Sequence, residues 1–173
     1  MAFSLYSATI PSYLQILPAI AGLIDKAEEY CTSNSLAPEA LIEKTLADDM
    51  WPFGKQVAVC AAHSAGAVAS LDEGVFHPPL NPHPTDFDGL RAIIADASAT
   101  LKAVTPEQID SKVGQDAAFA FGTRRMDFTA EDFLLSFALP NFYFHAATAY
   151  DILRAAGVPL GKGNFLGKVR VKV

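Results

Sequence analysis

The stretch AEDFLLSFALPNFYFHAATAYDILRAA, residues 130–156, decides the fold class, because its apolar residues recur at the spacing of an α-helix. Thr129 and Asp132 form a capping pattern at its start, and Gly157 supplies a stop at its end. Pro140 lies near the middle, where we expect a kink. The sequence therefore predicts one long helix, kinked near its centre.

Three further segments share this helical spacing, at residues 5–30, 53–71 and 87–104. Residues 72–85 separate the last two and are rich in proline, which predicts a long surface loop. We detect no internal repeat. Four long periodic segments joined by turns predict an all-α protein, an up-and-down four-helix bundle formed as a single domain over residues 1–173.

Two segments depart from this simple pattern. Pro11 and Pro18 lie inside the first periodic segment, so we expect either a first turn near Pro11 or a kink. Large apolar side chains alternate around Gly122 over residues 118–128, which indicates a short β-hairpin before the last helix. Residues 161–173 carry basic residues and no acid, and we interpret them as a solvated end.

Composition excludes several function classes. The formal net charge of -6 gives no attraction for phosphate backbones or anionic lipid, so neither a nucleic-acid partner nor a membrane partner is expected. No segment shows the roughly 20 uninterrupted apolar residues of a spanning helix, and the first residues lack a secretory signal. The only cysteines are Cys31 and Cys60, as is normal in a reducing compartment. We therefore expect a cytoplasmic protein, part of whose apolar surface is buried against a second copy.

Asn141, His145 and Thr148 share one face of the last predicted helix, because they stand four and three residues apart. Two interpretations remain open. In one, these polar groups bond to one another or to backbone carbonyls inside the core. In the other, they line a cavity that binds a small molecule or a metal.

His63, on the second predicted helix, is the other histidine that could face this cavity. Two imidazoles from two helices could contribute to a Zn²⁺ or Ni²⁺ site, but a catalytic metal normally has three protein ligands. The third ligand is not evident, and Asp48, Asp49 and Asp151 are candidates without a spacing argument.

The other reactive residues give weaker signals. His77 and His83 fall in the proline-rich loop and are expected to be exposed. Cys60 belongs to the apolar stripe of its helix and has no neighbouring cation in sequence, which favours packing over nucleophilic chemistry. The sequence lacks a phosphate-binding glycine loop, a zincin motif and a nucleophile elbow.

Several sequence blocks occur in an order that resembles a known family. The most specific are LADDMWPF at residues 46–53, followed by Gln56 and Val57, and LPNFYFH at residues 139–145. With them the chain resembles the uncharacterised bacterial and fungal proteins grouped as a domain of unknown function in the DinB/YfiT-like superfamily of proposed metalloenzymes. The resemblance implies a four-helix bundle, commonly paired as a homodimer, without an established activity.

The same resemblance implies a metal site. Metal-binding members use one histidine from the second helix and two histidines, four residues apart, from the last. His63 would take the first role and His145 one of the others, but the positions four residues either side of His145 are Asn141 and Ala149. The implied metal triad is incomplete.

We therefore hypothesise a DinB-like bundle protein with a small-molecule cavity at Asn141, His145 and Thr148. The sequence establishes no particular cofactor, and Zn²⁺ or Ni²⁺ are the metals that His63 and His145 would bind. A metal-dependent hydrolase or thiol transferase is the alternative from the enzyme class. A scaffold that pairs its apolar surface with another protein is the third hypothesis.

Overall fold

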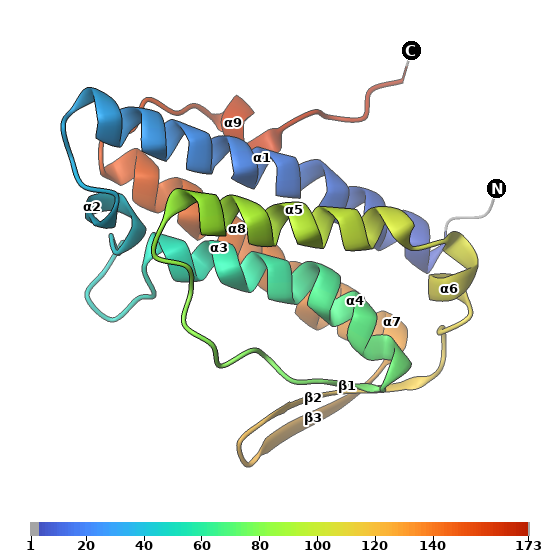
Figure 1. Ribbon diagram of the computed structural model, residues 1–173. Coiled ribbons are helices and arrows are strands. Elements are labelled where there is room, and N and C mark those ends of the chain that lie inside the picture. Colours follow the sequence, from blue (N-terminus) through green and yellow to red (C-terminus); the bar gives the residue numbers. More distant parts are fainter. Residues whose placement is uncertain (1–3, 173) are drawn as a thin grey trace.

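Four long helical stretches run side by side in the computed structural model, which describes residues 4–172 (Figure 1). In chain order they are α1 (Leu5–Ser33); α3 (Phe53–Ala61), η1 (Ala62–Gly66), α4 (Ala67–Ala69) and η2 (Ser70–Asp72); α5 (Phe87–Ala103); and α7 (Ala130–Asp132), η3 (Phe133–Ala138) and α8 (Leu139–Ala155). Shorter helices are α2 (Glu39–Ile42), α6 (Pro106–Asp110) and α9 (Lys162–Leu166). The prediction of a mainly helical protein is confirmed.

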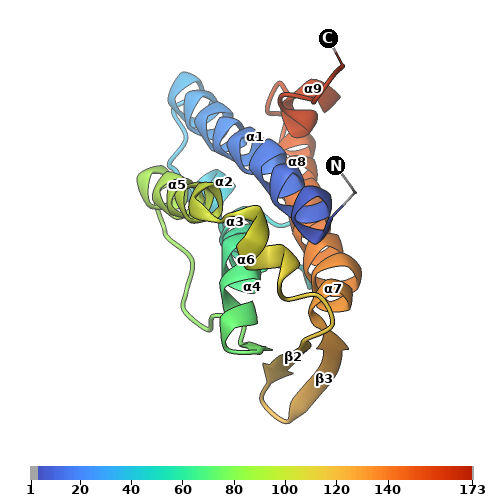
Figure 2. The same ribbon diagram turned by 90° about the vertical axis from the view of Figure 1, so that its right-hand side faces the viewer.

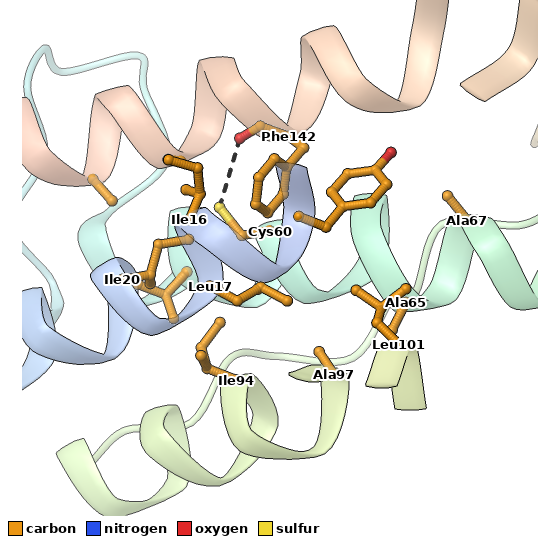
Figure 3. Packing of buried hydrophobic residues seen from close by; sticks show 14 of the residues in the cluster. Ile16, Leu17, Ile20, Cys60, Ala65, Ala67, Ile94, Ala97, Leu101 and Phe142 are labelled. Carbon is orange, nitrogen blue, oxygen red and sulfur yellow. Dashed lines mark hydrogen bonds between the residues drawn. The ribbon is translucent and has the colours of Figure 1, made fainter. Parts of the chain in front are cut away.

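The core lies between these stretches, where α1 packs against α5 and α8, and α3 packs against the same two helices. Figure 3 shows this core, to which α1 contributes Ile16, Leu17 and Ile20, all of them buried. Cys60 of α3 is fully buried beside Phe142 of α8, with its Sγ 3.9 Å from the Phe142 carbonyl oxygen. Burial raises the pKa of the Cys60 thiol, which agrees with a packing residue.

Helix α1 begins at Leu5 and continues through Pro11 and Pro18, so a first turn near Pro11 is not formed. The reason is the cap: the Ser4 and Ser7 side chains satisfy each other's backbone N–H groups, which starts the helix ahead of the proline. By length and composition α1 is apolar enough to cross a membrane, with a mean hydropathy of 1.3 over its best window, contrary to the expectation from sequence. A buried core helix passes the same test.

A small sheet accompanies the helices, so the all-α class is too narrow. Strand β1 (Val75–Phe76) pairs in parallel with β2 (Asp116–Phe121), which pairs in antiparallel fashion with β3 (Arg124–Thr129). The prolines of residues 72–85 were expected to keep this segment out of any sheet. β1 nevertheless forms near its start, because Val75 and Phe76 precede the first proline, Pro78. Figure 2 shows β2 and β3 projecting beside α4 and α7.

The basic tail does not run free into solvent over its whole length. It forms α9 and lies along α1, where the side-chain amide of Gln15 donates to the Leu166 carbonyl at 2.9 Å. The Arg170 guanidinium donates to the Pro11 carbonyl. Its side chains nevertheless remain largely exposed.

Candidate functional site

A cavity of about 320 Å³ opens between α3, η1, α8, β2 and the proline-rich loop. This volume lies within the usual range for small-molecule sites. Its lining is mostly apolar and consists of Trp51, Lys55, Val59, Ala62, His63, Pro78, Pro79, Leu80, Phe119, Phe121, Asn141 and His145. The fold therefore brings His63, Asn141 and His145 to one cavity.

His145 is held by a hydrogen-bonded chain that fixes the position of its proton. The ring is 7% exposed, and its Nδ1 lies 2.6 Å from Oε1 of the buried Gln56 side chain. The Gln56 amide nitrogen donates to the Trp51 carbonyl at 3.0 Å, which orients the amide oxygen toward the imidazole. Nδ1 therefore carries the hydrogen, and Nε2 is left as an acceptor without a protein partner among the described residues.

His63 is a buried polar residue of the cavity whose hydrogen bonding is incomplete. Its ring is 6% exposed, and its Nδ1 is buried without a hydrogen-bond partner in the described part of the chain. Phe76 and Phe137 lie against it, with ring centroids 5.3 and 5.7 Å away, and offer only aromatic faces and edges. A buried polar group without a partner costs stability, so His63 needs an explanation other than packing.

The aromatic rings at the cavity form a stacked row. The His63 and His145 centroids lie 5.9 Å apart with the rings 18° from parallel, and Trp51 stacks on His145 at 5.8 Å and 17°. Trp51 is 52% exposed, so part of its ring faces solvent while the ring also lies against His145. The exposed part of the Trp51 ring offers a flat surface of the kind that stacks on aromatic ligands.

Both imidazoles are neutral at pH 7. Desolvation lowers the pKa of His63 to about 4, with repulsion from His145 as a smaller cause. Desolvation likewise lowers the pKa of His145 to about 4. The site therefore offers uncharged nitrogens that can accept or donate hydrogen bonds, and no fixed positive charge from histidine.

The two other polar residues of helix α8 differ in position. Asn141 lines the cavity, and its Nδ2 donates to the Phe137 carbonyl at 2.7 Å, so its Oδ1 is the free atom. The Thr148 hydroxyl donates to the Phe144 carbonyl at 2.8 Å, and its side chain is not part of the lining. The backbone interpretation thus describes Thr148 and the amide nitrogen of Asn141, while Asn141 and His145 also line the cavity.

Two π-helical turns flank the cavity, which is a common feature of functional helices. His63 belongs to η1, and η3 ends two residues before Pro140. Proline lacks the N–H that an α-helical ladder would use and crowds the preceding turn, so a wider turn before it relieves both problems. We expected a kink at Pro140; the structure has a π-helical turn just before it, and Asn141 and His145 lie on the α-helix that follows.

The remaining sequence candidates lie elsewhere. Asp48, Asp49 and Asp151 are exposed and do not line the cavity. His77 is exposed, as expected. His83 is not: its side chain is only 15% exposed and its Nε2 lies 2.8 Å from Oε1 of Glu43, because the loop folds back over the start of α3.

Among the residues of the site that were not predicted from the sequence are Trp51, Lys55 and Gln56. A signal for Gln56 was present, because Gln56, Cys60 and His63 are spaced by four and three residues and so share one face of a helix. Trp51 and Lys55 carry no comparable signal, since their roles depend on how the loop before α3 folds.

The residues present do not complete the metal set that the superfamily implies. His145 Nε2 is available, but the unpartnered Nδ1 of His63 is fully enclosed, Asn141 offers only a neutral amide oxygen, and Ala149 has no ligand atom. No group of three or more His, Cys, Asp or Glu side chains gathers in the described residues. A site with three such ligands therefore does not fit this cavity.

These features define the class: a mainly helical protein with a buried pair of neutral histidines on a largely apolar cavity. The family model described as "Domain of unknown function (DUF1993)" matches residues 5–166, and the chain belongs to this family. The structure of a DinB family member protein from Shewanella denitrificans is similar at a TM-score of 0.80 and 25% identity, with 98% of this chain and 95% of that chain covered. No curated protein matches the chain. The protein is thus a member of an uncharacterised DinB-like family.

Proposed function

We propose that this protein is a DinB-like, up-and-down four-helix bundle that binds a small, flat molecule in the cavity beside Trp51, His63 and His145, without a three-ligand metal centre. The observation that carries the proposal is the pair of imidazoles. Each is more than nine-tenths buried and lines the apolar cavity, and His145 keeps its Nε2 without a protein partner among the described residues, whereas the unpartnered Nδ1 of His63 is itself closed off from solvent. Buried polar groups normally have partners, so a molecule bound in the cavity is the natural partner for His145 Nε2.

Metal-dependent hydrolysis or thiol transfer is the competing proposal. The orientation of His145 by Gln56 supports it, because metal-binding histidines commonly donate their second nitrogen to such a group. The shortage of a third ligand favours the metal-free proposal over it.

Trp51 provides a direct test, because it is the only tryptophan in the sequence and lines the cavity. Titration with an uncharged aromatic probe, methyl 4-hydroxybenzoate, is expected to change Trp51 fluorescence with saturation. A ligand of this size should reach a dissociation constant of about 1 mM or tighter. Wild-type protein is first treated with a chelator, so that binding is measured without metal.

The variant Ala62→Phe places a phenyl group on the cavity wall and is expected to abolish saturable binding. Ala95→Phe, on the exposed face of α5, is the matched control and should bind as wild type does. Absence of saturation in wild type, or equal binding in Ala62→Phe, would contradict the proposal. Stoichiometric Zn²⁺ or Ni²⁺ in untreated protein, lost in His145→Ala, would overturn its metal-free part.

A further inference from the structure

The cavity wall carries a single charged side chain, Lys55 of α3. Its Nζ lies 5.7 Å from the centroid of the Trp51 ring and donates to the Asn81 carbonyl at a long 3.3 Å. Among the described residues no carboxylate forms an ion pair with Lys55, and the lining contains no acid. An uncompensated cation beside apolar walls attracts an anionic group of the ligand.

Helix α8 contributes a different kind of polar group to the same cavity. His145 Nε2 and Asn141 Oδ1 are both acceptors, because the proton of His145 is on Nδ1 and the amide nitrogen of Asn141 is bonded to the backbone. The two residues are four apart and so share one helix face. Two acceptors without partners select a ligand that brings a hydrogen-bond donor, such as a hydroxyl group.

The walls between these polar groups suit a ring. Trp51 and the two histidines form the stacked row, and Phe119 and Phe121 of β2 add further aromatic surface. Stacking and edge contacts with such walls favour a planar aromatic ligand over a branched aliphatic one.

We propose that the ligand is a hydroxyaryl carboxylate: its carboxylate pairs with Lys55, its ring lies against the aromatic walls, and its hydroxyl donates to His145 Nε2 or Asn141 Oδ1. This assignment rests on the proposed function, since it names the chemical class of the molecule in that cavity. Lys55 of α3 thus recognises the carboxylate, and His145 or Asn141 of α8 recognises the hydroxyl group.

Three probes separate the contributions when their dissociation constants are measured by Trp51 fluorescence at pH 7: 4-hydroxybenzoate, its methyl ester and benzoate. Wild type is expected to bind 4-hydroxybenzoate about tenfold more tightly than either other probe, as loss of one charge-assisted or one buried hydrogen bond costs about tenfold. Lys55→Met keeps an unbranched side chain that is one atom shorter and removes the charge. The variant should bind 4-hydroxybenzoate no more tightly than the methyl ester, and should still bind it more tightly than benzoate.

Lys102→Met, on the exposed surface of α5, is the matched control and should retain both preferences. Equal binding of the acid and its ester by wild type, or a preference that survives in Lys55→Met, would overturn the ligand class and leave the cavity proposal standing. Failure of all three probes to bind would contradict the cavity proposal itself.

Discussion

Lowering the pH from 7 to 5 is expected to reduce the free energy of unfolding by roughly 2 kcal/mol for each of His63 and His145. In the unfolded chain each imidazole binds its proton near pH 6.5, whereas in the folded chain it does so near pH 4. Between these values the unfolded state holds more protons. Stability is therefore fully present above pH 6.5 and is lost as the pH falls toward 4.

Urea unfolding followed by circular dichroism at pH 7, 6 and 5 measures this loss. Carboxylates with ordinary pKa values remain mostly ionised in this range, so the slope reports chiefly on histidine. The variant His77→Gln removes an exposed imidazole and should keep the wild-type slope. A stability that does not change between pH 7 and pH 5 would show that the two buried rings are not held neutral.

The substitution His63→Leu is expected to stabilise the protein, by about 1 kcal/mol at pH 7 and by about 3 kcal/mol at pH 5. At pH 7 it removes a buried nitrogen without a partner and adds an apolar side chain next to Phe76 and Phe137. At pH 5 it also removes the cost of keeping a buried imidazole neutral. Denaturant unfolding of the variant at both pH values gives the two differences.

The same variant should bind methyl 4-hydroxybenzoate more weakly than wild type, since leucine replaces one of the aromatic rings that line the cavity. Stability gained together with binding lost is the pattern of a residue kept for function. His77→Leu, at an exposed position, is the control and should leave both properties nearly unchanged. If His63→Leu destabilises the protein instead, His63 is a structural residue and the proposal loses its main support.

Local patterns in the sequence were sufficient for the long helices and for one wall of the cavity, but not for the short helix α9 in the basic tail. The i, i+4 spacing places Asn141 and His145 on one face whatever the helix packs against. Spacing alone did not distinguish Asn141 and His145 from Thr148. A threonine hydroxyl can donate to the backbone carbonyl four residues earlier, as Thr148 does to Phe144, and then needs no other partner.

The rest of the site depends on contacts between distant parts of the chain. Gln56 and His145 are 89 residues apart in sequence, and no local pattern says that they meet. β1 forms because Val75 and Phe76 find a partner strand more than 40 residues later, in a segment otherwise read as loop. His83 likewise finds Glu43 only once the proline-rich loop has folded over α3. Such pairings follow from the packed fold and cannot be predicted from spacing.

The most direct test of the central claim is nitrogen NMR of the histidine rings at pH 6, with and without saturating 4-hydroxybenzoate. The sequence has four histidines, and His77 and His83 serve as internal references. We predict that His63 and His145 are neutral, that His145 carries its proton on Nδ1, and that its Nε2 resonance shifts when the ligand binds. Charged rings at pH 6, or ring resonances that ignore the saturating ligand, would contradict this account.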